Sequence, residues 1–88
     1  MSVKIKVSQV LRQFTKNRDT VEVNGGTVGE CLDDLIRRFP DTKKWLFDKD
    51  GRLLALMLIK GESIHQKELD RPVTGGDELH LVLVFGGG

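Results

Sequence analysis

The chain opens with an alternation of apolar and polar residues over positions 2–7. This period of two is typical of a strand with one face buried and the other in water. A second alternation covers positions 20–23 and ends at the glycine pair 25–26. We therefore predict a hairpin, with a connection of about ten residues that holds Leu11 and Phe14 against the core. The core-facing residues of the first strand are Val3, Ile5 and Val7.

A helix is predicted over residues 28–39. Thr27 and Glu30 have the spacing of a capping box, in which the Thr27 hydroxyl accepts from the Glu30 amide and the Glu30 side chain returns to the Thr27 amide. Pro40 ends the helix. The apolar stripe recurs at helical spacing, with Cys31 beside it, and consists of Val28, Leu32, Leu35, Ile36 and Phe39.

The polar side of this predicted helix carries paired charges. Asp33 stands four residues before Arg37, and Asp34 stands four residues before Arg38. An acidic residue that precedes a basic one by four positions stabilises a helix. We therefore expect both pairs to lie on the solvent side.

Residues 41–50 are expected to form a helical turn and a loop, with Trp45, Leu46 and Phe47 as apolar plugs. An unbroken apolar run over 53–59 follows, which is short for a helix and flanked by glycines, so a central strand is predicted. Solvation of Lys60 turns one face of that strand outward. The inward residues are then Ala55, Met57 and Ile59, and the outward residues are Leu54, Leu56 and Leu58.

The rest of the chain predicts a turn at 60–63, a short edge piece over 64–69, a tight connection over 71–78 and a final strand. Two alternating sets of side chains divide this last strand. The bulkier set, expected in the core, is Leu79, Leu81, Leu83 and Phe85; the outward set is His80, Val82 and Val84.

Composition restricts the class of protein. The 88 residues form one domain, and a net charge of +1 with interspersed signs argues against a nucleic-acid binder. The sequence has a single cysteine, Cys31, which excludes an internal disulfide. We therefore expect the protein to lie in a reducing cytoplasm. No stretch predicts a membrane span, and His65 and His80 lack partners at metal-binding spacing, so no metal site is expected.

The sequence ends in three glycines, which cost entropy to order and offer nothing to pack. A backbone without Cβ atoms can enter a narrow channel, so the tail is suited to carry the Gly88 carboxylate into another protein's active site. We predict a β-grasp domain over 1–85 and a flexible tail over 86–88. This α+β, ubiquitin-like fold has a mixed sheet of four to five strands, the first and last paired in the middle, and one main helix across one face.

Motifs along nearly the whole chain resemble the MoaD/ThiS family of ubiquitin-like sulfur carriers. These motifs follow the family's order and end at its functional glycine pair. They are segments 10–14 and 26–30, then Leu32, Leu35 and Phe39-Pro40, segments 46–48, 50–53, 69–73 and 75–79, and finally Gly87-Gly88. The chain departs from many members where they carry prolines before the tail, because Leu83, Val84, Phe85 and an added Gly86 stand there.

The resemblance implies a cycle of activation and sulfur transfer. A ubiquitin-activating-type enzyme adenylates Gly88 with ATP, and sulfur from a persulfide then replaces AMP to leave a thiocarboxylate. A sulfur-accepting synthase subunit takes this sulfur for molybdopterin, thiamin or cysteine assembly. The chain would act as a carrier, or as the small subunit of such a synthase, with no catalytic side chain and no cofactor of its own, ATP being used by the activating partner.

Within this interpretation, each candidate residue has a stated role. Gly88 is the site of adenylation and sulfur attachment, and Gly86 and Gly87 give access. An exposed apolar sheet face is typical of a partner surface. The residues assigned to docking are Leu56, Leu58, His80, Val82, Val84 and Phe85.

Alternatives remain for several features. Activated Gly88 could instead form an isopeptide with a target lysine, or the domain could bind partners only through its sheet. The apolar face could also be covered by the Trp45 loop or by a second copy of the chain. Cys31 fits the apolar stripe as a small core residue, which we favour over a thiol that receives sulfur.

Overall fold

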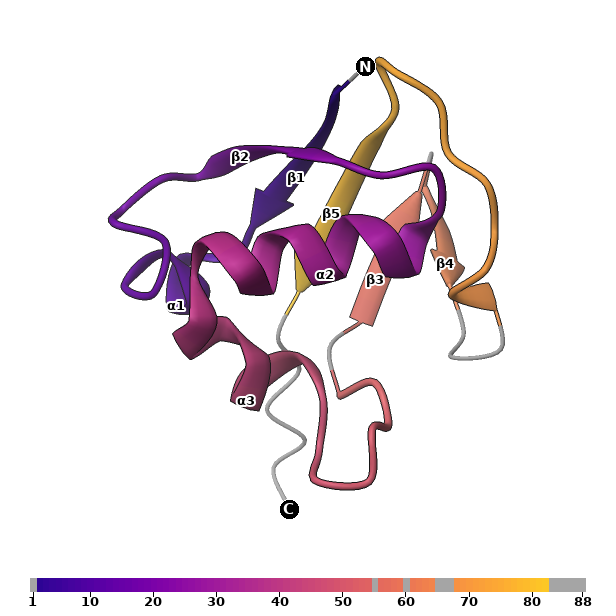
Figure 1. The fold of residues 1–88 in the computed structure, drawn as a ribbon. Coiled ribbons are helices and arrows are strands. Elements are labelled where there is room, and N and C mark those ends of the chain that lie inside the picture. The colour runs from indigo at the N-terminus through magenta and orange to yellow at the C-terminus, as the bar shows by residue number, and fades with distance from the viewer. Residues whose placement is uncertain (1, 55, 60, 65–67, 83–88) are drawn as a thin grey trace.

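The structure is a computed structural model that describes residues 2–54, 56–59, 61–64 and 68–82. Its helices and strands are coloured in chain order in Figure 1. They are β1 (Ser2–Val7), α1 (Gln9–Arg12), β2 (Thr20–Asn24), α2 (Val28–Arg38), the 3₁₀ helix η1 (Pro40–Thr42), α3 (Lys43–Leu46), β3 (Leu56–Ile59), β4 (Glu62–Ile64) and β5 (Glu78–Val82).

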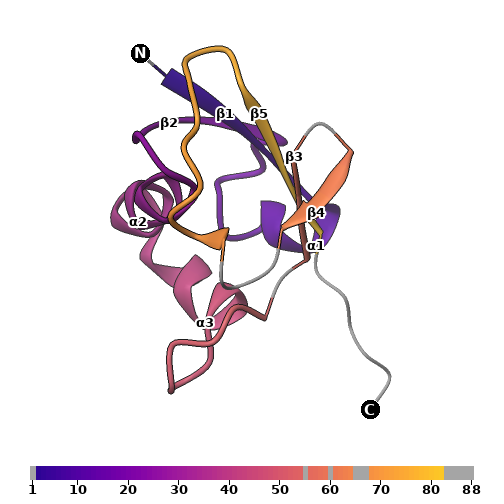
Figure 2. The same ribbon diagram turned by 90° about the vertical axis from the view of Figure 1, so that its right-hand side faces the viewer.

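The strands form one mixed sheet in the order β2-β1-β5-β3-β4. β1 and β5 pair in parallel at its centre, and the other neighbouring pairs are antiparallel. α2 crosses one face, as Figure 1 shows, and the turned view of Figure 2 places it on one side of the strands. The predicted β-grasp, with its first and last strands in the middle, is confirmed.

The core lies between α2 and the sheet. The predicted inward residues of β1 are all buried, as are Met57 and Ile59 on β3 and Leu79 and Leu81 on β5. Leu11 is buried and Phe14 packs at the margin, so the connection after β1 covers the core as expected. The stripe of α2 contributes Val28, Cys31, Leu32 and Leu35, while Ile36, Phe39, Trp45 and Phe47 are partly buried against this cluster.

The start of α2 departs in one detail from the predicted capping box. The Thr27 hydroxyl accepts from the Glu30 amide at 3.1 Å, as expected. The Glu30 carboxylate, however, accepts from the amide of Gly26 at 2.7 Å instead of the Thr27 amide. The side chain reaches one residue further back and so ties α2 to the chain that enters it.

Asp34 does not lie on the solvent side of α2, as the charge pattern predicted, because its side chain is only 4% exposed. Its carboxylate accepts from the backbone amide of Asn24, at the end of β2, with a distance of 2.9 Å. Arg37 and Arg38 both donate to the same carboxylate, so Arg37 pairs with Asp34. One buried carboxylate therefore joins the end of β2 to the middle of α2.

The predicted bounds of the third and fourth strands need correction. β3 begins at Leu56, because the Leu54 amide donates to the Leu46 carbonyl at 2.7 Å and Leu53 bridges to Phe47. β4 begins at Glu62, inside the expected turn. Gly61 has φ 81° and reverses the chain in the left-handed region, so Glu62 already pairs with Ile59.

The buried position of Asp34 predicts a pH-dependent stability. The Asn24 hydrogen bond, together with those from the two arginines, outweighs burial and lowers the pKa of Asp34 from 3.8 to about 2. A carboxyl group whose pKa is lowered by folding stabilises the protein above its unfolded pKa and loses that effect as the pH falls through the folded value. We expect Asp34→Asn to lower the free energy of unfolding by about 2 kcal/mol at pH 7, with the difference vanishing near pH 2.

Urea unfolding followed by Trp45 fluorescence measures this effect. Asp33→Asn is the matched control, since Asp33 is the exposed neighbour on the same helix. Equal free energies of unfolding for the two variants at pH 7 would show that the Asp34 network contributes nothing.

Candidate functional site

The outer face of the sheet, opposite α2, gathers part of the predicted docking set. The register of β3 against β5 places Leu58 beside His80 and Leu56 beside Val82. These pairs follow from the alternation that buries Met57, Leu79 and Leu81 on the other face. We call Leu58, His80 and Val82 the outer sheet face.

Exposure on this face is uneven. The Val82 side chain is 38% exposed, and Leu58 and His80 are partly exposed. Leu54, predicted to point outward, is 50% exposed, although it precedes β3. Val84, Phe85 and the glycines 86–88 lie outside the described residues, so their assigned roles remain predictions.

A small charged network borders the outer sheet face on the side of β1. The Glu78 carboxylate lies 2.9 Å from His80 Nε2 and 3.4 Å from Lys6 Nζ. Burial acts to raise the pKa of Glu78, but the hydrogen bonds from Lys6 and His80 outweigh it and lower that pKa. The face thus combines apolar side chains with a neighbouring carboxylate whose pKa is lowered.

Cys31 is fully buried in the core, which agrees with the favoured interpretation of this residue. Burial, followed by the nearby charges of Asp34 and Glu30, raises the pKa of the Cys31 thiol from 9.0 to about 11. The thiolate is the nucleophilic form, so this side chain is unsuited to accept sulfur near neutral pH.

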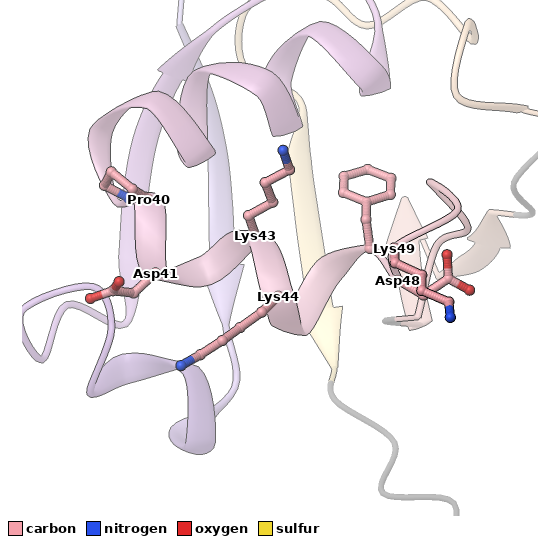
Figure 3. A pocket seen from close by; sticks show the side chains of 7 residues that line it. Pro40, Asp41, Lys43, Lys44, Asp48 and Lys49 are labelled. Atoms are coloured by element: carbon pink, nitrogen blue, oxygen red, sulfur yellow. The ribbon is translucent and has the colours of Figure 1, made fainter.

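A cavity of about 480 Å³ lies beside α3 and the loop that follows it (Figure 3). Lysines line it, but Figure 3 shows the Lys43 and Lys44 side chains pointing in different directions. The Asp48 carboxylate already accepts hydrogen bonds from the backbone amides of Asp50 and Arg52, at 2.8 and 2.9 Å. These charges do not converge on one ligand.

The part of the chain that the structure describes contains neither a metal-binding cluster of side chains nor a membrane-spanning helix. There, no group of three or more His, Cys, Asp and Glu side chains could hold a metal ion. His65 lies outside the described residues. Over those same described ranges, no helix has the length and apolar character needed to cross a bilayer.

Comparison with known protein families identifies the chain. Residues 5–88 match the ThiS family, a span that includes the glycine tail. The protein belongs to the ThiS family. Comparison with curated protein sequences gives no match.

Solved structures of several related proteins have the same fold as this ThiS-family chain. Small archaeal modifier protein 1 (SAMP1) of Haloferax volcanii is 30% identical, with a TM-score of 0.84 and full coverage of both chains at 100%. A chain in the BexX/CysO complex of Amycolatopsis orientalis is 27% identical, with a TM-score of 0.84, and the match covers 98% of this chain and 99% of that one.

A third structure shares the fold alone. A chain in the complex of subunits 1 and 2 of the molybdopterin-converting factor from Helicobacter pylori is 17% identical, with a TM-score of 0.66 and coverage of 100% of both chains.

The family match, together with the more similar of these structures, confirms the resemblance to the MoaD/ThiS carriers. The chain is a ubiquitin-like protein of the sulfur carrier or modifier type.

Sequence reasoning missed the surface between β2 and α2. A hollow of about 540 Å³ lies there, and its lining includes Lys16, Arg18 and Arg38. These cations are separated in the sequence and line one hollow because α2 runs back alongside β2, so that its last turn lies near the start of that strand. The only sequence signal was the basic character of the turn before the second strand.

The buried thiol leads to a prediction about reactivity. We expect Cys31 in the folded protein to resist alkylation by iodoacetamide at neutral pH, because its pKa of about 11 keeps it protonated and the core excludes the reagent. The same thiol should react at once in urea. Mass spectrometry of the alkylated protein measures both rates, and rapid labelling without urea would contradict the core assignment.

Proposed function

We propose that the protein is a sulfur carrier whose Gly88 carboxylate is adenylated and converted to a thiocarboxylate. The observation that supports this most directly is the match to the ThiS family over residues 5–88, which extends through Gly87 and Gly88. The thiocarboxylate then donates sulfur in the biosynthesis of a sulfur-containing cofactor, of the molybdopterin type, or of a related metabolite.

The chemistry explains why activation must come first. A carboxylate is a poor electrophile at neutral pH, and joining it to AMP, with release of pyrophosphate, supplies a good leaving group. The terminal sulfur of a persulfide attacks the carbonyl carbon and AMP departs. A second thiol then cleaves the sulfur–sulfur bond, so that one sulfur stays on Gly88 and the donor leaves as a disulfide.

The chain's own contribution is presentation of its C-terminal tail. β5 is fixed in the sheet between β1 and β3 up to Val82. Six residues follow Val82 in the sequence, and six residues can span at most about 20 Å when extended. That length is enough for Gly88 to reach into a partner's active site, and three glycines present no side chain to a narrow channel.

The outer sheet face is the proposed docking surface for the partner enzymes. Leu58, His80 and Val82 lie on the strands that precede the tail, so an enzyme that binds this face holds the origin of the tail in place. The related chains from A. orientalis and H. pylori occur in complexes with protein partners. An adenylating enzyme that binds ATP and a sulfur-accepting synthase subunit are the partners we propose for this chain.

A second candidate function is protein modification. The 30% identity with small archaeal modifier protein 1 favours it, and it shares the adenylation step. In this case the activated Gly88 carbonyl is attacked by a lysine amine of a target, and an isopeptide bond replaces the thiocarboxylate.

The intact mass of the protein, purified from its own host without reducing agents, tests the proposal. We expect a population heavier by the difference between one sulfur and one oxygen atom, with the change located in the C-terminal peptide. Incubation with ATP, a persulfide donor, a second thiol and the activating enzyme should increase it. Adducts of high mass linked through Gly88 would instead establish the modifier function.

A variant that lacks Gly87 and Gly88 is the control, because it keeps the whole β-grasp domain. It should show neither the mass increase nor any adducts. If the full chain also gives no adenylate and no heavier species with any candidate activating enzyme, both functions fail, and the domain acts only by non-covalent binding.

Docking through the outer sheet face predicts a specific loss of activation. We expect Val82→Lys to lower kcat/KM for adenylation about tenfold through KM, because a lysine desolvated in an apolar contact costs more than about 1 kcal/mol. Pyrophosphate exchange measures this rate. Asp33→Lys places the same side chain on an exposed site of α2 and should leave the rate unchanged. Equal rates for the two variants would place docking elsewhere.

A further inference from the structure

β2 is an edge strand, and the direction of its backbone groups follows from the hydrogen bonds of β1. The Lys4 amide donates to Asp77 and the Ser8 amide to Leu81, so the even-numbered residues of β1 bond on the β5 side. The odd-numbered residues then bond on the β2 side. The Val7 amide, which donates to Asp19 at 3.0 Å, agrees with this.

The antiparallel register transfers this alternation to β2. Val21 and Val23 stand opposite Ile5 and Val3, so they use their backbone groups toward β1. The amides and carbonyls of Thr20, Glu22 and Asn24 consequently point away from the sheet. The Asn24 amide confirms this direction, because it donates outward to Asp34 Oδ2 at 2.9 Å.

Two residues of this edge remain open. Among the described residues, none bonds to the outward amides and carbonyls of Thr20 and Glu22. Asp34 closes the edge at Asn24, so the open part is bounded at that end. Unpaired groups at alternate positions of an edge strand are a template for another extended chain.

The space beside this open edge is hollow. A cavity of about 540 Å³ runs along Thr20, Val21 and Glu22 and is bounded on the other side by Arg38 and Phe39, at the end of α2. Figure 1 shows β2 and α2 running alongside each other. We call this cavity, together with the open edge of β2, the β2–α2 groove.

The β2–α2 groove is lined mainly by basic side chains at one end and by acidic side chains toward the other. Lys16, Arg18 and Arg38 line the end near Thr20, against the single carboxylate of Glu22. Arg38 is held in place because its Nε donates to Asp34 Oδ2 at 2.9 Å. Toward Asn24, a smaller hollow of about 210 Å³ is lined by Glu30, Asp33 and Asp34, with Arg37.

We propose that the β2–α2 groove binds an extended segment of a partner protein as an added strand. Acidic side chains of that segment meet Lys16, Arg18 and Arg38, while its backbone pairs with Thr20 and Glu22. A peptide backbone supplies donors and acceptors in the alternation that the edge needs. The phosphodiester groups of a nucleic acid supply only acceptors and cannot pair with the two carbonyls, and the acidic end of the groove repels any phosphate.

This surface is separate from the proposed docking face. β1 and β5 lie between β2 and β3 in the sheet, and Val82, where the described part of the chain ends, lies on β5. A partner in the β2–α2 groove therefore leaves the outer sheet face open for an activating enzyme. The inference does not depend on adenylation of Gly88, and it can hold or fail independently of the sulfur carrier function.

Nuclear magnetic resonance of the full chain, labelled with ¹⁵N, tests the proposal. The probes are two short synthetic peptides of alternating valine and threonine, one with a run of aspartates at its N-terminus and one with the run at its C-terminus, for the two possible strand directions. We expect one of them to shift the resonances of Thr20, Glu22 and Arg38. It should also slow hydrogen exchange of the Thr20 and Glu22 amides at least about tenfold, since opening the added strand must then precede exchange.

Two altered peptides distinguish binding by backbone pairing from binding by charge attraction alone. Replacing the aspartates with lysines should abolish binding, because the groove cations then repel the peptide. N-methylation of the peptide amides that face β2 should also abolish it, because these amides can no longer donate to the Thr20 and Glu22 carbonyls. Binding that survives N-methylation would overturn strand addition.

The matched protein variants are two pairs of substitutions that remove the same charge. Lys16→Gln with Arg18→Gln should weaken the peptide about tenfold, since each exposed ion pair contributes up to about 1 kcal/mol. Lys43→Gln with Lys49→Gln, beside α3, should leave the affinity unchanged. The proposal is wrong if neither aspartate peptide protects Thr20 and Glu22 at the highest soluble concentration, or if the shifts map to Leu58 and Val82.

Discussion

The parallel pairing of β1 with β5 is the constraint on which the rest of this structure depends. It joins the first and last strands at the centre of the sheet, with Ile5 beside Leu79 and Val7 beside Leu81. A parallel pair cannot be closed by a tight turn, so everything between these strands has to cross the sheet or extend it. α2 makes the crossing and covers the core, and β3 and β4 extend the other side. The strand that leads to the tail is therefore held on both of its edges.

Local patterns predicted most of this architecture, because each reports directly on burial. The alternation in β1 identified Val3, Ile5 and Val7, and helical spacing identified the buried side of α2. Asp34 was misplaced because its burial depends on the Asn24 amide, a partner ten positions away that no helical pattern contains. The predicted third strand began too early for a related reason, because the Leu54 amide donates to the Leu46 carbonyl and not to a neighbouring strand. In both cases a tertiary hydrogen bond overrode a local preference.

The candidate sites were predictable to different degrees. Outward positions on β5 and β3 follow from alternation alone, so His80 and Leu58 could be placed on one face before their register was known. The β2–α2 groove could not be predicted, because it depends on which side of β1 each amide uses and on the return of α2 past β2. The glycine tail lies between these cases. Its role stays a prediction from residue type and order, and the match to the ThiS family extends over it.

The burial of Cys31 has a practical consequence for experiments on this protein. It is the only cysteine in the sequence, and its side chain is fully enclosed. A cysteine placed on the surface by substitution would thus be the only thiol that a maleimide dye reaches in the folded state. Fluorophores or spin labels could be attached on the outer sheet face or beside β2, with the native core left intact. Distances between this protein and a labelled protein partner could then be followed as the two associate and separate.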